Sequence, residues 1–210
     1  MKKGKFVVLD GPEGSGKTGA KEAARKHFKK RRNLIFTREP GGTKAGELIR
    51  EFLMSDESAG ISAEQEIVLF CASRIIHLDQ IIKPALENGI SVICDRFATS
   101  TFAYEIYGRN RLDLLPFFQK MNALTIGDIR PDAIIILDVS PGVGLARREK
   151  SLEGKCTRFD KEALEYHERV RRGFLSQIDK LSSWHTINTD ELSEQEVHKR
   201  VIQIITAVLK

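Results

Sequence analysis

The segment GPEGSGKT, residues 11 to 18, constrains the fold of this chain more than any other. It matches the pattern G-x-x-x-x-G-K-[ST], follows the apolar run KFVVLD and precedes a run of helix-forming residues. A glycine-rich turn between a strand and a helix points backbone N–H groups at an anion, and the helix N-terminus adds partial positive charge. The predicted phosphate-binding residues are Gly11, Pro12, Glu13, Gly14, Ser15, Gly16, Lys17 and Thr18.

Three side chains of this loop carry separate expectations. Lys17 is expected to reach the terminal phosphates of a nucleotide, and the Thr18 hydroxyl is expected to hold Mg²⁺. Glu13 is unusual, because a carboxylate beside phosphates costs electrostatic energy. It either accepts a hydrogen bond from a sugar hydroxyl of a second substrate or points to solvent.

Short apolar runs alternate along the chain with longer helical patterns, as in parallel strands buried on both faces. They occupy residues 5 to 10, 33 to 37, 90 to 95 and 133 to 139, and more weakly 184 to 188. We predict an α/β fold, a P-loop three-layer sandwich whose five-stranded parallel sheet is covered by helices on both faces. With 210 residues, a single domain over 1 to 210 is the simplest organisation.

Polar residues mark where several helices begin. Ser62 with Gln65, and Ser193 with Glu196, have the spacing of a capping box. Pro141 is placed at a first helical position, where its missing N–H is not needed.

The charge balance suits a protein that handles anions. The chain has 34 basic and 29 acidic residues, a formal net charge of +5. Much of the excess lies in KHFKKRR, residues 26 to 32, which is either the solvated end of a helix or a nucleic-acid patch.

The three cysteines, Cys71, Cys94 and Cys156, lack metal-ligand spacing and favour a reducing, cytoplasmic setting. No apolar run approaches the ~20 residues that cross a bilayer, so we expect no membrane partner.

Arginines follow two further strands of the predicted sheet. TREPGGT (37 to 43) follows the second strand and DRFATSTFAYEIYGR (95 to 109) follows the third. Because the carboxyl ends of parallel strands meet at one edge, these arginines are expected to converge with the phosphate loop. Guanidinium groups bind phosphates in a bidentate manner, so the pattern suggests a second phosphate-bearing ligand opposite the nucleotide.

These blocks resemble the bacterial thymidylate kinases. LDGPEGSGKT, TREPGGT, GELIREFL, LFCASR, CDRFATSTFAYEIYGR and TRFDKE occur in family order across nearly the whole chain. The resemblance implies a cytoplasmic enzyme that transfers the γ-phosphate of ATP to dTMP with Mg²⁺. It also implies a homodimer built on long helices, including one from Ser62 to about Glu87.

The resemblance assigns roles around the acceptor nucleotide. The carboxylate at the Glu13 position bonds the 3′-hydroxyl of the acceptor. Phe70 matches the ring that stacks on thymine, although its apolar neighbours also fit a core position, and Arg74 matches the donor to thymine O4. Tyr104 matches the aromatic residue that crowds the 2′ position.

The phosphate and metal contacts follow from the same resemblance. Arg38, Arg50 and Arg96 match arginines around the acceptor phosphate, and Asp95 matches a carboxylate that helps hold Mg²⁺ through water. Lys17 and Arg96 are also expected to stabilise charge during transfer.

A basic stretch at about 146 to 160 is expected to form a lid. In relatives a catalytic arginine comes from the phosphate loop or from the lid, and here the variable loop positions carry no basic residue. We therefore assign Arg148 and Arg158 to the phosphates and Arg147 to stacking on adenine, although Arg147 and Arg148 could exchange roles. The segment from Asn188 to Asp190 falls where the adenine loop of the family lies, and Asn188 is the residue assigned to the nucleotide.

Two positions depart from the family pattern. Gly19 replaces a second threonine, at a cost of about 1 kcal/mol in helix stability. Glu105 replaces a glutamine that contacts the base edge, and an ionised glutamate only accepts hydrogen bonds. Either Glu105 turns to a neighbouring arginine, leaving the base to Arg74 with Ser100 or Thr101, or the base preference is altered.

Three functions are therefore compared. The leading hypothesis is a thymidylate kinase, and the second is another nucleoside monophosphate kinase with an altered base preference. The third is a P-loop switch or nucleic-acid-binding ATPase, which would show ATPase activity stimulated by DNA or RNA. The convergent arginines favour a kinase, for which no nucleic-acid partner is expected.

Overall fold

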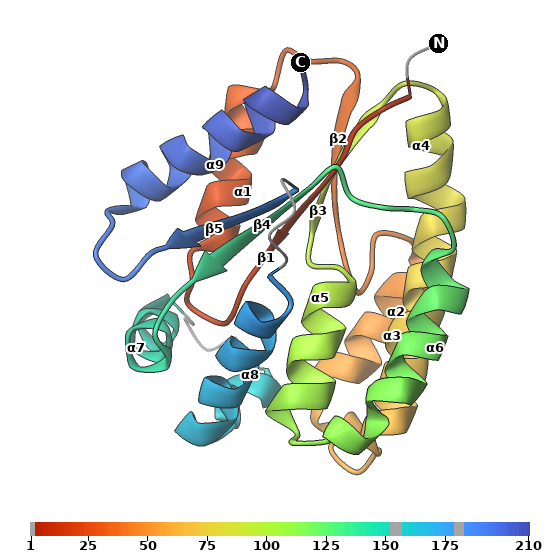
Figure 1. Ribbon diagram of the computed structural model, residues 1–210, viewed down its shortest axis with the longest axis vertical. Helices are drawn as coiled ribbons and strands as arrows, with labels where there is room; N and C mark the ends of the chain where they lie inside the picture. Colours follow the sequence, from red (N-terminus) through yellow and green to blue (C-terminus); the bar gives the residue numbers. More distant parts are fainter. Residues whose placement is uncertain (1–2, 152–156, 179–182) are drawn as a thin grey trace.

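The computed structural model describes residues 3–151, 157–178 and 183–210. Five strands form one sheet in the order β2-β3-β1-β4-β5, and every neighbouring pair is parallel (Figure 1). The strands are β1 Phe6–Asp10, β2 Leu34–Arg38, β3 Ser91–Asp95, β4 Ala133–Asp138 and β5 Trp184–Asn188. All five predicted strands are confirmed, with ends that differ by no more than one residue.

Nine α-helices lie within the described residues. They are α1 Lys17–His27, α2 Lys44–Met54, α3 Ala63–His77, α4 Lys83–Glu87, α5 Ala98–Thr101, α6 Leu115–Ile126, α7 Pro141–Ser151, α8 Leu164–Ser176 and α9 Glu194–Val208. None of them combines the length and the apolar character needed to span a bilayer.

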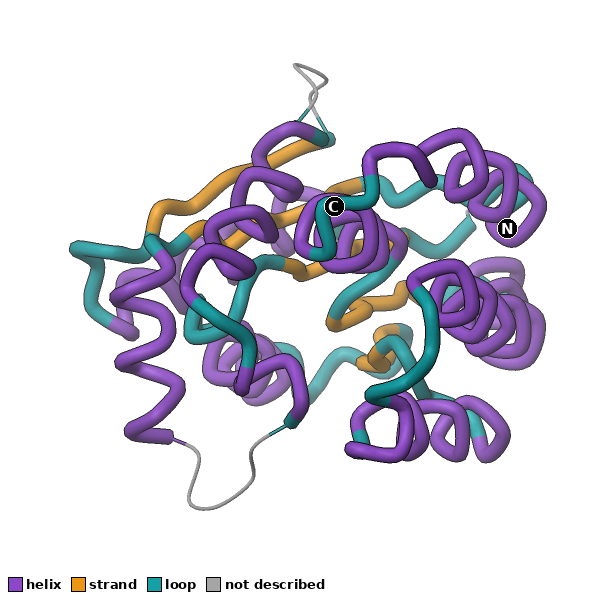
Figure 2. Tube along the Cα trace, turned by 90° about the horizontal axis from the view of Figure 1, so that it is seen from below, coloured by secondary structure: helices purple, strands orange, loops and turns teal. Residues whose placement is uncertain are grey.

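Alternate strand residues enter two separate cores. Val7 and Leu9 pack with α1 and α9, whereas Phe6 and Val8 pack with α4 and the helical turn before it. Figure 1 shows α1 and α9 on one side of the sheet and α3 and α4 on the other, and the view from below shows helices on both sides of the strands (Figure 2). The predicted three-layer α/β fold is confirmed, while the single domain over 1 to 210 stays a prediction.

The predicted helix starts are confirmed. Gln65 Oε1 accepts from the Ser62 N–H at 2.8 Å, and Ser193 forms the same reciprocal box with Glu196. Helix α7 begins at Pro141. These caps satisfy backbone groups that a helix end otherwise leaves unpaired.

Two π-helical segments shape the elements near the sheet edge. Leu78–Ile82 joins α3 to α4, so the chain stays helical from residue 63 to 87, close to the predicted range. Phe102–Gly108 continues α5 and carries Tyr104 and Glu105. A π-helical turn changes the direction of side chains that a regular α-helix would fix, and such turns are frequent at functional sites.

The carboxyl ends of the strands form the functional edge. The phosphate loop leaves β1, Glu39 follows β2, and Arg96 follows β3. In an open parallel sheet, ligands bind at this edge.

Candidate functional site

A cavity of about 640 Å³ opens at the carboxyl edge of the sheet. The predicted site residues that line it are Glu13, Gly14, Ser15, Gly16, Lys17, Thr18, Arg50, Phe70, Arg74, Asp95, Arg96, Ser100, Thr101, Tyr104, Arg147 and Arg148. Gly11, Pro12, Arg38, Glu105 and Asn188 lie outside its lining. Residues from the phosphate loop, α3, the segment after β3 and α7 therefore share one space.

The phosphate loop adopts the conformation that its glycines allow. Gly16 precedes α1 in the left-handed region with φ 89°, and Gly14 has φ 68°. A side chain at Gly14 would collide with the carbonyl oxygen of Gly144. These glycines let the loop turn into α1, whose first N–H groups have no partners within the helix and suit an anion.

The Lys17 ammonium lies folded back into its own loop. Nζ donates to the carbonyl oxygens of Gly11 at 2.8 Å and Pro12 at 2.6 Å, and lies 3.2 Å from Ser15 Oγ. Burial, together with the nearby Arg96 charge, lowers the pKa of Lys17 to about 8. A phosphate in the loop would supply the negative charge that this buried ammonium needs.

Arg96 is the hub of the polar network. It has φ 69°, which is rare for a residue with a side chain and is found at strained functional positions. Its guanidinium donates to Ser100 Oγ and Glu13 Oε1, both at 2.9 Å, and to the Gly11 carbonyl at 3.2 Å. The guanidinium carbon lies 5.1 Å from the centre of the Tyr104 ring. These contacts fix Arg96 between the phosphate loop and the acceptor side of the cavity.

Glu13 points into this network. It accepts hydrogen bonds from Arg96 and from the Tyr104 hydroxyl. Burial alone would raise the pKa of Glu13, but the Arg96 and Lys17 charges outweigh it and lower the pKa. Glu13 is therefore an ionised acceptor in the cavity.

Arg50, one of the predicted acceptor-phosphate arginines, lies close enough to Arg38 and Arg96 to feel their charges. Arg50 lines the cavity and donates to the Pro40 carbonyl at 3.1 Å. Burial and the like charges of Arg38 and Arg96 lower the pKa of Arg50. Such a gathering of cations is stabilised by a bound anion. Arg38 itself is half exposed and pairs with Glu47 at 2.7 Å, outside the cavity lining.

The predicted base-binding residues Phe70 and Arg74 also line the cavity. Phe70 is partly buried. Arg74 is buried, and its Nη2 donates to Thr101 Oγ1 at 2.9 Å. Both residues lie on α3, and their spacing of four positions puts them on one helical face.

Glu105 is turned away from the cavity. It is fully buried, and its Oε2 accepts from Arg109 Nε at 2.8 Å. Arg109 also pairs with the buried Glu66. Of the two alternatives for this departure from the family, the geometry favours the first, in which Glu105 pairs with a neighbouring arginine.

The two predicted metal ligands fit a hard cation by their chemistry. Thr18 and Asp95 both line the cavity and offer a hydroxyl and a carboxylate oxygen, the ligand type that Mg²⁺ prefers. Burial would raise the pKa of Asp95, but the neighbouring Lys21 outweighs it and the pKa is lowered. Lys21 Nζ lies 2.7 Å from Asp95 Oδ2.

The residues predicted to bind the adenine of the nucleotide come from α7 and from the end of β5 and the loop that follows it. Arg147 Nη2 donates to the carbonyl oxygens of Thr189 at 2.9 Å and Asp190 at 3.2 Å. Asn188 does not line the cavity, and its Oδ1 accepts from the Asp190 N–H at 2.9 Å. Thr189 takes that place in the lining.

The predicted lid is described in part. Residues 152–156 and the side chain of Arg158 lie outside the described residues, as does Cys156. Arg148 Nε and Nη2 bond the two oxygens of Asp160 at 2.7 and 3.1 Å. Asp160 also accepts from the Thr157 N–H at 2.8 Å, so Arg148 is held against the turn that follows the undescribed segment.

Several lining or supporting residues were missed by sequence reasoning. Asp10 is fully buried and accepts hydrogen bonds from Gly11 N–H, Thr99 and Ser100. Its position at a strand end, directly before the glycines, was an available signal. The other residues missed are Phe97, Phe159, Asp160 and His198. Their contacts depend on tertiary packing, which no local pattern records.

Comparison with known proteins agrees with this geometry. The family model described as thymidylate kinase matches residues 9–201. A thymidylate kinase of Bacillus cereus is 38% identical over 205 residues, which cover 97% of each chain. One of Protochlamydia amoebophila is 41% identical over 185 residues, or 84% of this chain and 80% of the relative.

A solved structure shows the same likeness in three dimensions. The thymidylate kinase of Ehrlichia chaffeensis superposes with a TM-score of 0.75 at 32% sequence identity, covering 97% of this chain and 99% of the other. The residues that the family model matches include the phosphate loop, the arginine segments and the lid region. A family model and relatives that span nearly the whole chain, together with a shared fold, establish that this chain belongs to the thymidylate kinase family.

Proposed function

We propose that this protein transfers the γ-phosphate of ATP to dTMP, giving dTDP, with Mg²⁺ as its metal ion. The observation that carries this proposal is the shared cavity, which is lined both by the phosphate loop and by Phe70, Arg74 and Tyr104. In-line phosphoryl transfer requires a donor and an acceptor in one water-poor space. The relatives named above are thymidylate kinases, which supports the same reaction.

The side chains around the cavity account for most of what the reaction needs. The loop N–H groups and Lys17 bind the donor phosphates, while Arg50 and Arg96 hold the acceptor phosphate between them. Arg148 enters from α7 to offset charge on the transferred group. Bound Mg²⁺ would neutralise further phosphate charge, and Thr18 and Asp95 would hold it.

The acceptor sugar and base are selected by contacts on the opposite side. Glu13 is ionised and accepts a hydrogen bond from the 3′-hydroxyl, while the Tyr104 ring crowds the 2′ position. Phe70 stacks on the pyrimidine and Arg74 donates to its C4 carbonyl. Because Glu105 lies outside the cavity lining, we expect it to be a tolerated departure from the family pattern.

A coupled assay of ADP release tests the proposal. The protein is given ATP and Mg²⁺ with dTMP, dUMP, dCMP or dGMP in parallel reactions. A clear preference for dTMP is the expected result. Preference for another monophosphate would support the kinase with altered base choice, and DNA-stimulated ATPase activity without acceptor turnover would support the nucleic-acid ATPase.

We also propose a homodimer in a reducing, cytoplasmic compartment. Val68 and Ile75 of α3 are apolar and about 43% exposed, as an interface between two copies would require. The described cysteines, Cys71 and Cys94, are buried free thiols, which suits a reducing environment. Light scattering during size-exclusion chromatography should give twice the monomer mass.

A further inference from the structure

Arg74 is held on three sides and has one nitrogen, Nη1, without a hydrogen-bond partner among the described residues. Its Nε donates to Glu39 Oε2 at 2.7 Å, its Nη2 donates to Thr101 Oγ1, and its guanidinium carbon lies 5.1 Å from the centre of the Phe97 ring. Nη1 is itself buried. Since Arg74 lines the cavity, the N–H groups of Nη1 are available to donate to an acceptor atom of a bound ligand.

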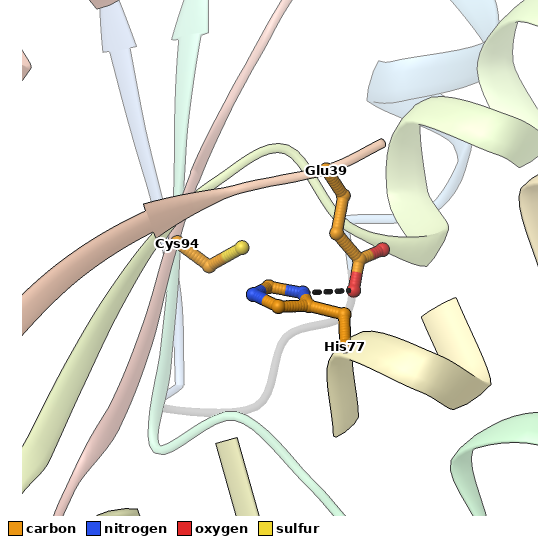
Figure 3. Close-up of side chains that lie close together, drawn as sticks. All are labelled: Glu39, His77 and Cys94. Atoms are coloured by element: carbon orange, nitrogen blue, oxygen red, sulfur yellow. Dashed lines mark hydrogen bonds and ion pairs between the residues drawn. The ribbon is translucent and has the colours of Figure 1, made fainter. Parts of the chain in front are cut away.

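The carboxylate of Glu39 orients this guanidinium. It is 4% exposed, and its two oxygens have different partners. Oε2 receives the Arg74 bond, whereas Oε1 receives a bond from His77 Nδ1 at 3.0 Å (Figure 3). Because both oxygens are engaged, the carboxylate cannot rotate without breaking one of these bonds.

His77 is fixed in turn by Thr37. The His77 ring is fully buried, and its Nε2 lies 2.7 Å from Thr37 Oγ1. In the neutral tautomer that donates from Nδ1 to the carboxylate, Nε2 is the acceptor and the Thr37 hydroxyl is the donor. A side chain at Gly42 would stand 2.7 Å from both atoms, which leaves room there for glycine alone.

The same side chains resemble a metal site but do not form one. Glu39, His77 and Cys94 are the one group of three clustered ligand types in the described part of the chain (Figure 3). The Arg74 guanidinium, however, already occupies a Glu39 oxygen, so a cation placed there would face a buried positive charge. The Cys94 thiol donates to the Arg96 carbonyl at 3.1 Å instead. The cluster is therefore a hydrogen-bonded relay that runs from Thr37 through His77 and Glu39 to Arg74.

We propose that Glu39 and His77 are positioning residues for base selection, which aim Arg74 Nη1 at the carbonyl oxygen on C4 of a pyrimidine. This inference rests on the proposed function and deepens it. A guanidinium has five N–H donors, and only a fixed orientation presents a chosen pair to the ligand. Cytosine carries an amino group at C4, which would face these donors with another donor, so the relay rejects dCMP.

The test compares kcat/KM for dTMP with kcat/KM for dCMP in variants of the relay. Glu39→Gln and His77→Ala are expected to lower the dTMP-to-dCMP ratio by about tenfold or more, the effect of one misdirected buried hydrogen bond. The loss should lie in KM for dTMP, with kcat at saturation changed much less, because the phosphate contacts remain. His77→Asn retains an amide N–H close to the Nδ1 position and is expected to restore most of the ratio.

Ser73→Ala is the matched control. Ser73 is the buried neighbour of Arg74 on α3, and its Oγ accepts from the Gly41 N–H at 3.2 Å without touching the guanidinium. Its loss is expected to lower turnover of both nucleotides by the same factor. Should neither relay variant fold, Thr37→Val, which removes only the last hydroxyl, must lower the ratio in the same direction.

The outcomes separate this inference from the proposed function. A wild-type protein that does not distinguish dTMP from dCMP overturns the proposed function, and the role of the relay with it. A wild-type protein that does distinguish them, with folded variants that keep the wild-type ratio or lower both activities equally, overturns the relay alone.

Discussion

The Nε atom of Arg109, directly after the π-helical segment, lies 2.8 Å from Oε2 of Glu105 within that segment. Glu105 is fully buried, and so is Glu66, the second carboxylate that pairs with Arg109. Arg109 thus compensates two buried acidic groups. Glu105, one of the two departures from the family pattern, forms a buried ion pair in the interior of the protein.

Replacing Glu105 by Gln is therefore expected to leave base preference intact. The amide keeps the shape of the side chain, and Arg109 keeps its pair with Glu66. The dTMP-to-dUMP and dTMP-to-dCMP ratios of kcat/KM should stay within about twofold of the wild type, because Glu105 lies outside the cavity lining. A change of tenfold in either ratio would return Glu105 to the base-reading residues.

Removing Arg109, by contrast, should lower the stability of the protein. Arg109→Ala leaves two buried carboxylates without their shared cation, and breaking a buried ion pair from one side costs about 3 kcal/mol or more. Urea denaturation should show this loss of unfolding free energy. Arg111→Ala is the control, since Arg111 pairs with Glu64 and Asp113 at the surface, where a much smaller loss of unfolding free energy is expected.

Local sequence patterns predict most of the elements of the fold. The strand runs, the capping boxes and the phosphate loop are each read within a few residues, and the structure places them where the sequence predicts. Arg74 and Phe70 also share a helical face, as their spacing requires.

The polar contacts between elements could not be read in this way. Glu39 meets His77 across 38 positions of the chain, and Arg74 meets Glu39 across 35. Such pairs depend on how α3 packs against the end of β2, which the spacing of residues along the sequence does not encode. The direction of Glu105 likewise depends on the π-helical segment Phe102–Gly108, because a single extra residue in a helical turn redirects the side chains around it.

ATP binding should weaken as the pH rises above about 8. Burial, followed by the Arg96 charge, lowers the pKa of Lys17 from 10.5 to about 8 in the ligand-free protein. Bound phosphates favour the protonated ammonium, so binding takes up a proton above this pH. Calorimetry at pH 7 to 9.5 should show Kd rising by up to about tenfold per pH unit above 8. Lys17→Arg, whose side chain stays charged, should show a nearly flat profile, and a flat wild-type profile would contradict the prediction.

The bond between Arg148 and Asp160 should contribute to catalysis through positioning. Asp160→Asn removes the charge that holds Arg148 in a bidentate pair, and kcat is expected to fall by about tenfold or more because misplacement of a charge-stabilising group raises the barrier to transfer. Rapid-quench kinetics separates this loss in the chemical step from slower product release. Lys161→Ala is the control from the same turn, since its ammonium pairs with the exposed Asp56 and kcat should be unchanged. Equal rates of the chemical step in Asp160→Asn and the wild type would show that Arg148 does not act through this pair.

The contact between Tyr104 and Glu13 predicts a separation of two roles in one side chain. Tyr104→Phe removes the hydroxyl that donates to Glu13 but keeps the ring, which packs edge-on against Phe159 with centroids 5.7 Å apart. Since Arg96 still holds Glu13 at 2.9 Å, KM for dTMP should rise by only about threefold to tenfold, the effect of one hydrogen bond. Discrimination against the ribonucleotide should persist, because the ring and not the hydroxyl crowds the 2′ position. Tyr104→Ala should lose that discrimination. The measurement is kcat/KM for dTMP and for its ribonucleotide analogue in both variants. Retained discrimination in Tyr104→Ala would mean that another group excludes the 2′-hydroxyl.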